Sequence, residues 1–210
     1  MPTSSRRGTW FTLACVLLLG LFLVRNGAGE ATGGPPQPRA AAAAHKSAAE
    51  PLPAAPGPLP HSLPRRIVVP SLRVDAPLTA VGLDADGWVD APPLHNGNLA
   101  GWYRGGVSPG ERGTSVVVGH VDNPAGPAVF YSLGSLQRGS RIEILRGDGR
   151  IAVFAVYAVQ VFAKKNFPAA QIYRDAPRPE LRVLTCGGGY AKKTGYDGNI
   201  VAFARLTEVR

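Results

Sequence analysis

The sequence predicts an all-β fold, a sandwich or a barrel, for residues 67–210. Three observations carry this prediction. Short runs of β-branched and aromatic residues follow one another beyond residue 66, and Gly, Pro and Asp-Gly separate them. Only residues 127–136 have the composition of a short helix. The chain has 210 residues, 45% of them hydrophobic, so this region is long enough to close a sheet around a packed core.

Seven segments have the composition expected of strands. They are residues 66–69, 74–78, 114–120, 141–145, 151–162, 181–185 and 200–206. The Asp-Gly dipeptide at 148–149 lies between two alternating runs, which predicts a hairpin turn there. Across this hairpin we expect Glu143 and Leu145 to neighbour Ile151 and Val153.

An apolar run of sixteen residues, 9–24, lies between Arg6-Arg7 and Arg25. As a helix it would span about 24 Å, slightly less than the ~30 Å hydrocarbon core of a bilayer. It is therefore either a short membrane anchor or the core of a signal peptide. No clean small-x-small cleavage motif follows at once, so we expect an uncleaved single-pass anchor. The basic residues before the run predict a cytoplasmic N-terminus and an extracellular C-terminal domain.

Residues 26–66 are rich in Pro, Ala and Gly and have few large apolar side chains. Such a segment cannot recover its chain entropy by burial, so we expect a disordered stalk. The predicted organisation is a cytoplasmic stub and transmembrane anchor in residues 1–25, a linker in 26–66 and a folded domain in 67–210. His45 and His61 fall in the linker, so we expect both to be solvated and non-catalytic.

Charge and cysteine content exclude several classes of protein. The formal net charge is +9, but the first 66 residues carry seven Lys or Arg against two Glu, which leaves only a mild excess beyond them. That excess is scattered without interleaved aromatic residues, so we expect no nucleic-acid partner. Two cysteines cannot form a disulfide-rich scaffold or a four-thiolate zinc site. The acidic residues of 84–90 lack the spacing of a calcium loop and read as a turn, so no metal or cofactor is expected.

Cys186 is the candidate nucleophile. If Cys15 lies in the membrane, Cys186 is the only thiol of the exported domain, and it is then a packed side chain, half of an intermolecular disulfide, or a nucleophile. The predicted strand 181–185 leads directly into Cys186 and the glycines at 187–189. This places the sulfur at a strand end in an open turn, whereas a structural cysteine more often faces the core in mid-strand. The pattern favours the nucleophile.

A nucleophilic thiol needs a nearby group that exchanges protons with it and with the leaving group. The folded region offers two histidines. His120 ends the strand of residues 114–119 beside a glycine, and His95 lies in the irregular segment 92–97. The strand end favours His120, while His95 and a purely structural role for both remain alternatives.

Two motifs give the sequence a resemblance to a known family. Gly119-His120-Val121-Asp122 after a valine strand, together with Leu184-Thr185-Cys186-Gly187-Gly188, resembles the sortases, the membrane-anchored cysteine transpeptidases of Gram-positive cell walls. The tripeptides at 101–103 and 109–111, with Tyr196 to Asn199, resemble the class F subgroup of actinobacteria. The resemblance runs from about residue 67 to residue 206, and it implies a closed eight-stranded β-barrel with one or two short helices.

The resemblance also implies a two-step acyl transfer. Cys186 would attack the Thr-Gly bond of a Leu-Pro-x-Thr-Gly type sorting signal and form a thioester. His120 would protonate the departing amine and later deprotonate the incoming one. The implied partners are secreted proteins with C-terminal sorting signals and an amine acceptor, either a cell-wall precursor or a protein lysine.

The sequence departs from the family where sortases carry an arginine shortly after the cysteine. Residues 196–199 stand there instead, and Arg205 lies six residues further on, about 20 Å along a strand, where we expect an ordinary solvated side chain. Three substitutes as oxyanion donors remain open: the Asn199 amide, Arg104 in a Gly-rich loop, and the backbone N–H groups of 187–189. Thr185 either helps to orient the substrate or is placed by strand propensity alone.

Two rival functions are retained. A non-catalytic, membrane-tethered barrel could bind cell-wall glycan or a protein partner through Trp88, Trp102 and Tyr103, although core packing explains these aromatic residues as well. An L,D-transpeptidase is also a cysteine enzyme of the cell wall. That family has a Ser-His-Gly-Cys motif around its nucleophile, whereas Thr185 precedes Cys186 in this sequence.

Overall fold

The computed structural model describes residues 16–17, 34–38 and 56–210. The chain divides into two compact units, residues 1–34 and 35–210. Apart from Val16 and Leu17, which are helical, the predicted anchor of residues 9–24 lies outside the described residues. Within the described ranges, no helix has the length and apolar character needed to cross a membrane.

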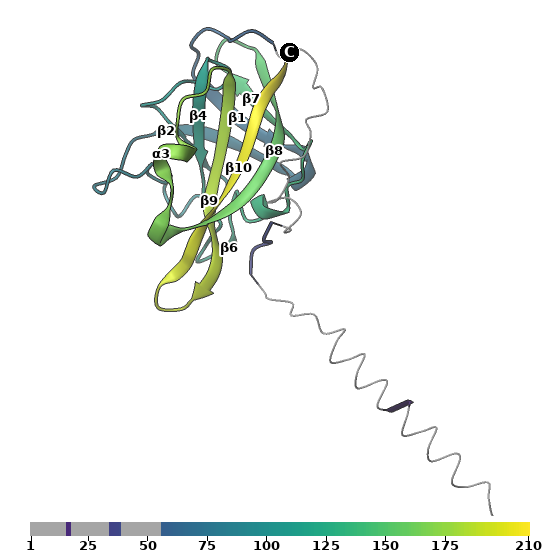
Figure 1. Cartoon of the computed structure of the whole chain (residues 1–210), viewed down its shortest axis with the longest axis vertical. Coiled ribbons are helices and arrows are strands. Elements are labelled where there is room, and N and C mark those ends of the chain that lie inside the picture. The colour runs from purple at the N-terminus through teal and green to yellow at the C-terminus, as the bar shows by residue number, and fades with distance from the viewer. Residues whose placement is uncertain (1–15, 18–33, 39–55) are drawn as a thin grey trace, which may run out of the picture. The chain divides into compact units, whose positions relative to one another are not determined.

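Eight strands close into a barrel in the order β1-β2-β3-β4-β9-β10-β8-β7, which confirms the predicted all-β fold and its closed eight-stranded form (Figure 1). The strands are β1 (Pro64–Val69), β2 (Val74–Val81), β3 (Ala100–Tyr103), β4 (Gly113–Val118), β7 (Arg141–Arg146), β8 (Ile151–Ala163), β9 (Pro179–Ala191) and β10 (Gly195–Val209). A separate two-stranded sheet pairs β5 (Asp122–Asn123) with β6 (Gly126–Pro127).

The helical elements are few and short. They are the 3₁₀ turns η1 (Pro70–Leu72), η2 (Leu133–Ser135) and η3 (Lys164–Asn166), and the α-helix α3 (Ala169–Ile172). The predicted helix at 127–136 is therefore wrong except for η2, because the chain at Pro127 pairs in β6 instead. Both α3 and the four-residue β3 escaped prediction, since neither is long enough to show a clear period.

The ordered domain begins before residue 67, which corrects the end of the predicted linker. Strand β1 starts at Pro64, where it pairs with Arg146 of β7. The Arg146 side chain is fully buried and donates hydrogen bonds to the Pro60 carbonyl oxygen at 2.5 Å and to Ser108 Oγ at 3.2 Å. A buried guanidinium needs such partners, so it fixes the proline-rich chain that enters β1. Composition alone indicates an extended segment and does not reveal this docking.

The hairpin between β7 and β8 has the predicted register. Glu143 faces Val153 and Leu145 faces Ile151. Gly149 has a φ of 83°, which a residue with a Cβ adopts only with strain. The Asp-Gly signal therefore located this turn correctly.

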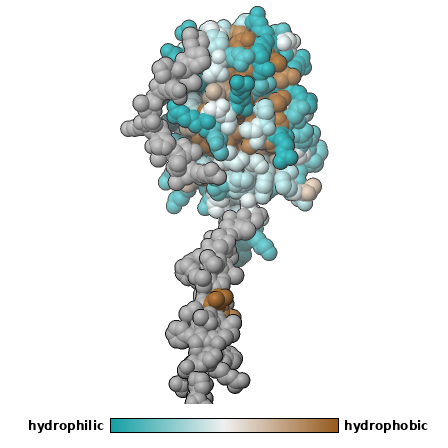
Figure 2. Space-filling model, turned by 90° about the vertical axis from the view of Figure 1, so that its right-hand side faces the viewer, coloured by the Kyte–Doolittle hydropathy of each residue, from teal (hydrophilic) through white to brown (hydrophobic). Residues whose placement is uncertain are grey.

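Two apolar layers lie on the two sides of the barrel wall. The inner layer fills the barrel, and its largest fully buried side chains include Phe130, Phe154, Ile67, Leu133, Ile142, Ile144, Leu181, Ile200 and Leu206. The outer layer lies on the outside of β4, β9 and β10 and consists of Val81, Val116, Val118, Ile172, Leu184 and Val201. Ile172 belongs to α3, so the connection between β8 and β9 covers this outer face. A different face of the barrel shows apolar patches among polar side chains (Figure 2).

Candidate active site

The parallel pairing of β4 with β9 brings the two predicted catalytic residues together. Val118 of β4 is in register with Leu184 of β9. His120 and Cys186 each follow two residues later. His120 lies just beyond the end of β4, whereas β9 continues through Cys186 to Ala191, so the predicted strand end at Cys186 is wrong and the cysteine lies in mid-strand, paired with Asn199 of β10. Both side chains line one pocket there, and both residues are half-buried.

Two hydrogen bonds join the segment just after β4 to β9. The Gly119 N–H donates to the Leu184 carbonyl oxygen at 3.1 Å. The buried Thr185 hydroxyl donates to the Gly119 carbonyl oxygen at 2.8 Å. Thr185 therefore connects the residue before His120 with the residue before Cys186, which is a positioning contact that strand propensity does not require.

A glycine is needed on one side of each candidate catalytic residue because other groups approach closely. A Cβ on Gly119 would lie 2.6 Å from Phe130 Cδ2, and a Cβ on Gly187 would lie 2.5 Å from Ile200 Cγ1. Real Cβ contacts are essentially never that short, so any larger residue would displace the backbone or its neighbours there. The glycines at 119 and 187 thus let His120 and Cys186 sit against the inner core.

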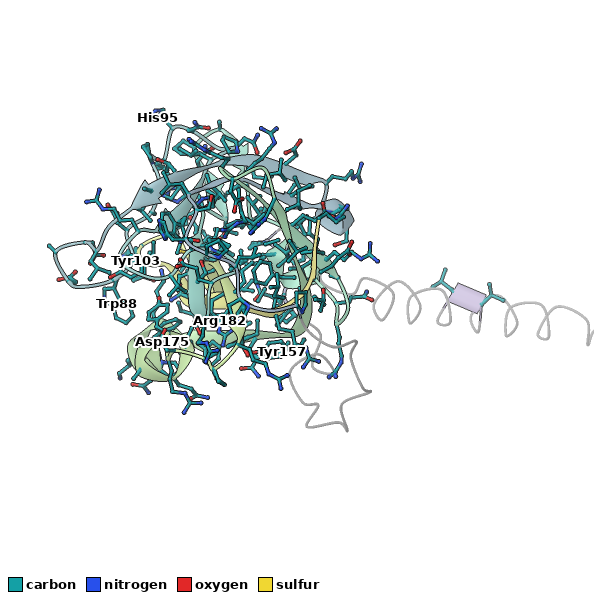
Figure 3. The ribbon with its side chains drawn as sticks, turned by 90° about the horizontal axis from the view of Figure 1, so that it is seen from above. Trp88, His95, Tyr103, Tyr157, Asp175 and Arg182 are labelled. Carbon is teal, nitrogen blue, oxygen red and sulfur yellow. The ribbon has the colours of Figure 1, made fainter. Side chains whose placement is uncertain are left out.

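The backbone fixes the tautomer of the His120 ring. Its Nε2 lies 2.7 Å from the carbonyl oxygen of Pro92. A carbonyl oxygen only accepts hydrogen bonds, so Nε2 carries the hydrogen and the neutral ring keeps its lone pair on Nδ1. Within the described residues, no hydrogen bond joins this ring to the Cys186 thiol. The other candidate, His95, is exposed, lies at the edge of the molecule and does not line the pocket (Figure 3).

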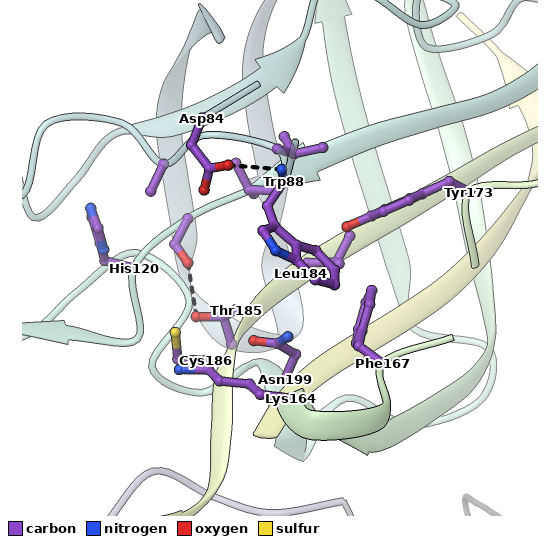
Figure 4. A pocket seen from close by; sticks show the side chains of 14 residues that line it. Asp84, Trp88, His120, Lys164, Phe167, Tyr173, Leu184, Thr185, Cys186 and Asn199 are labelled. Atoms are coloured by element: carbon purple, nitrogen blue, oxygen red, sulfur yellow. Dashed lines mark hydrogen bonds between the residues drawn. The ribbon is translucent and has the colours of Figure 1, made fainter. Parts of the chain in front are cut away.

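The pocket at this edge is a cavity of about 430 Å³ with apolar walls and a polar end. Figure 4 shows Trp88, Phe167, Tyr173 and Leu184 along one part of it, and Cys186, Thr185 and Asn199 along another. The rings of Trp88 and Phe167 meet edge to face with centroids 5.6 Å apart. Burial raises the pKa of Tyr173 to about 12, so its phenol stays neutral at physiological pH. Such a cavity fits apolar side chains of an extended peptide beside the thiol.

The structure separates the three predicted oxyanion donors. Asn199 of β10 is in register with Cys186 and lines the pocket, whereas Arg104 is exposed and does not line it. The backbone N–H of Gly188 donates to Gln37 Oε1 at 3.2 Å. The N–H of Gly189 donates to Asp197 Oδ1 at 2.7 Å. Of the two predicted side-chain donors, Asn199 is therefore the one whose position suits the role.

The prediction that Arg205 is an ordinary solvated side chain is wrong. It is half-buried in β10, where it pairs with Glu180 of β9. Its Nε is buried and has no hydrogen-bond partner among the described residues. The spacing of Arg205 from Cys186 could not indicate this partial burial. Arg205 does not line the pocket.

The three aromatic residues of the rival binding function do not form one surface. Trp102 is 3% exposed and belongs to the inner core, and Tyr103 packs against the outer layer. Trp88 alone is exposed, at 41%, and it lines the pocket. The turn that carries Trp88 was predicted: Asp84 Oδ1 accepts the Trp88 N–H at 2.8 Å, and the Gly87 N–H donates to the Asp84 carbonyl oxygen.

A second contact links the loop after His120 to the strand after Cys186. The Tyr196 hydroxyl donates to Asp122 Oδ2 at 2.5 Å, across 74 residues of sequence. Burial and the Asp122 carboxylate raise the pKa of the Tyr196 phenol. Both residues belong to the motifs that the sequence analysis singled out, and their contact joins the two segments in space.

Sequence reasoning missed several residues of the pocket. Lys164, Phe167 and Tyr173 all come from the connection between β8 and β9 and line the cavity with Cys186. No short motif marks them. The available signal was the break in the strand pattern after residue 162, followed by Lys164-Lys165 and then Phe167.

At the opposite end of the outer face, a buried arginine holds this connection in place. Arg182 of β9 is 6% exposed and forms an ion pair with Glu180 at 2.6 Å. It also donates to the Ile172 carbonyl oxygen of α3 at 3.3 Å, and its guanidinium carbon lies 4.7 Å from the centre of the Phe203 ring. Tyr157 donates to Glu180 at 2.8 Å. This group, Arg182 with Glu180, Tyr157 and Phe203, is called the arginine cluster below.

Comparisons with known proteins agree with this geometry. Residues 67–207 match the Sortase domain family. Among solved structures, sortase A of Listeria monocytogenes is 16% identical with a TM-score of 0.52, and the match covers 72% of this chain and 90% of that one. The SrtA sortase of Actinomyces oris is 21% identical with a TM-score of 0.54, over 76% of this chain and 89% of that one.

A third similar structure is sortase C1 of Streptococcus agalactiae, solved in complex with MTSET. It is 18% identical with a TM-score of 0.53, over 69% of this chain and 67% of that one. At these identities the structural likeness is one of fold. No curated protein sequence matches the chain.

Proposed function

Because the chain belongs to the sortase family, it is a cysteine transpeptidase that acts on cell-wall proteins, and we propose that it cleaves a Leu-Pro-x-Thr-Gly-like sorting signal through a Cys186 thioester. The main observation behind this proposal is that Cys186, within β9, and His120, just after the parallel strand β4, line one cavity. The apolar walls of that cavity suit the Leu and Pro side chains of such a signal.

In the first step, the Cys186 thiolate attacks the carbonyl carbon of the Thr-Gly bond. Negative charge develops on the carbonyl oxygen, and the Asn199 amide donates a hydrogen bond to it. The C–N bond then breaks, and protonated His120 gives its proton to the departing amine. The peptide up to the Thr stays on Cys186 as a thioester.

In the second step, an amine acceptor enters from a cell-wall precursor or a protein lysine. Neutral His120 removes a proton from the amine, whose nitrogen attacks the thioester carbon. The C–S bond breaks, the thiolate of Cys186 returns, and a new amide joins the sorted protein to its acceptor. Each proton that His120 takes up is given back, so the cycle closes.

We also propose a sortase class and a cellular location for this protein. Residues 101–103, 109–111 and 196–199 support membership of class F. The apolar run at 9–24, with basic residues before it, supports a single-pass anchor with the barrel outside the cell. On this basis the substrates are secreted proteins that carry C-terminal sorting signals.

The test is a transpeptidation assay with the full-length protein. A panel of Leu-Pro-x-Thr-Gly peptides that vary at each position is incubated with a glycine-based or lysine-based amine, and the ligated product is measured by mass spectrometry. We expect ligation of at least one peptide by the wild type and none by Cys186→Ala. If a tetrapeptide stem of peptidoglycan were crosslinked while every sorting peptide stayed intact, the chain would use a different acyl donor.

A further inference from the structure

Apart from His120, which exchanges its proton during the reaction, no residue predicted to act at the polar end of the cavity supplies a permanent positive charge. Asn199 is neutral, Arg104 does not line the cavity, and Arg182 and Arg205 lie further along the outer face. We propose that Lys164 is the cationic catalytic residue of this site, and that its ammonium acts with Asn199 on the Cys186 thiolate and on the oxyanion. The proposal rests on the acyl-transfer function given above.

Strand register places Lys164 beside the nucleophile. Asn199 of β10 pairs with Cys186 on one side and with Phe162 of β8 on the other. Strand β8 ends at Ala163, so Lys164 follows at the same edge of the barrel, where η3 begins. Lys164, Asn199 and Cys186 all line the cavity, and in the view of Figure 4 the Lys164 side chain extends toward Cys186.

The backbone that carries Lys164 is well anchored. Phe167, three residues later, meets the ring of Phe162 edge to face with centroids 6.0 Å apart. The centroid of the Phe167 ring also lies 5.6 Å from that of the Trp88 ring and 6.0 Å from that of the Tyr173 ring. The turn therefore has a fixed place at the cavity, while the long Lys164 side chain can move with the reacting atoms.

Charge also favours this role. Lys164 is the only Lys or Arg among the described residues that line the cavity, and it forms no ion pair with any described residue. The one carboxylate in the lining, Asp84, accepts backbone N–H groups of Asp86 and Trp88. An unpaired ammonium beside a thiolate and a developing oxyanion stabilises both, and an amide donor alone carries no net charge.

The first test measures local charge without any sorting substrate. The full-length protein is alkylated with anionic iodoacetate and neutral iodoacetamide, and modification at Cys186 is followed by peptide mass mapping, which separates it from Cys15. The ratio of the two rate constants reports positive charge near the sulfur. We expect Lys164→Met to lower this ratio about 3- to 10-fold, since a unit charge within several ångströms is worth roughly that factor at a partly solvated site.

The neighbouring residue supplies a matched control. Lys165 is also exposed in η3 but does not line the cavity. We therefore expect its charge to act less on the sulfur, so Lys165→Met should leave the ratio within about 1.5-fold of wild type. Lys164→Arg keeps the charge and should keep the ratio. If Lys164→Met and Lys165→Met gave the same ratio, the proposal would be overturned.

The second test measures catalysis on a sorting peptide. We expect Lys164→Met to lower kcat about 10- to 100-fold with little change in KM, because the ammonium acts on charge that develops in the transition state. Lys164→Arg should restore most of kcat. A fall in kcat equal to that of Lys165→Met, or a rise in KM alone, would contradict the role.

The two tests together distinguish a failure of the proposed function from a failure of the role proposed for Lys164. If no sorting peptide is turned over by the wild type, yet the alkylation ratio falls in Lys164→Met, the cation beside Cys186 stands and the acyl donor of the proposed function is wrong. If peptides are turned over and neither the ratio nor kcat responds to Lys164→Met, the function stands and Lys164 has no part in it.

Discussion

The two ends of the outer barrel face carry charged groups in opposite states. At one end, the arginine cluster buries Arg182 and gives it partners: Glu180, the Ile172 carbonyl oxygen and the Phe203 ring. At the other end, Cys186, Lys164 and Asn199 line an open cavity and make no side-chain hydrogen bonds with one another among the described residues. Both ends lie on the same strands, β9 and β10, and differ only in what the connection 164–178 brings to them.

This difference distinguishes charged groups that stabilise the fold from polar groups that are available to a substrate. A buried charge whose partners are satisfied holds structure, and removing it leaves its partner without compensation. Polar groups that remain unpaired in a cavity are available to a substrate. The same connection does both: α3 is held by the arginine cluster, and η3 presents Lys164 to the cavity. Changes at the two ends should therefore affect different observables.

The largest effect is expected at the cavity end. Cys186→Ala removes the atom that forms the thioester, so turnover should fall below detection, about 10⁴-fold or more. His120→Ala should lower kcat about 10²- to 10⁴-fold through the loss of proton transfer. The thermal midpoint of both variants should stay within about 2 °C of wild type, as measured by calorimetry. A large loss of stability in Cys186→Ala would mean that the thiol is a packed side chain.

The next effect is expected at the other end and in a different observable. Arg182→Met leaves Glu180 without its ion pair and frees α3, so the free energy of unfolding should fall by about 3 kcal/mol. Denaturant unfolding measures this, and Arg178→Met, an exposed residue outside the cluster, is the control. Full stability in Arg182→Met would show that the cluster does not support the connection.

Within the cavity, Asn199 and Arg104 can be distinguished. Asn199→Ala removes a donor next to Cys186 and should lower kcat about 10- to 100-fold with KM nearly unchanged. Arg104→Ala should change kcat less than about twofold, because Arg104 does not line the cavity. If Arg104→Ala lowered kcat more than Asn199→Ala, Arg104 and not Asn199 would be the oxyanion donor.

The smallest effect concerns the contact between Thr185 in β9 and Gly119 after β4. Thr185→Val keeps the β-branched shape but loses the hydrogen bond to the Gly119 carbonyl oxygen, which should cost about 1 kcal/mol of stability and lower kcat several-fold. Thr185→Ser keeps the hydroxyl and should retain kcat. Equal behaviour of the Val and Ser variants in kinetics would reduce Thr185 to a residue placed by strand propensity.

Local sequence signals predicted the structure correctly where a particular backbone geometry requires a particular residue type. The Asp-Gly turn located the β7–β8 hairpin with its register, and Gly119 marked the end of β4. The glycines after Cys186 did not mark a strand end, because β9 continues through them to Ala191. The all-β fold followed from the succession of short strands. Asn199 was a candidate because it stands in the segment where sortases carry an arginine after the cysteine.

Features that depend on long-range pairing could not be predicted. Lys164 reaches the cavity because β10 pairs with both β8 and β9, which no short segment indicates. The docking of the proline-rich chain before β1 depends on Arg146, more than 80 residues later. Arg205 was expected in solvent, but its burial is set by the neighbouring strand and not by its own neighbours in sequence.

The formation of an acyl-enzyme tests the central claim most directly. The full-length protein is mixed with a Leu-Pro-x-Thr-Gly peptide without an acceptor amine, quenched in acid, and mapped by mass spectrometry. We predict an added mass equal to the peptide up to its Thr, on Cys186, absent in Cys186→Ala and strongly reduced in His120→Ala. An adduct on another residue, or cleavage that persists in Cys186→Ala, would contradict the account.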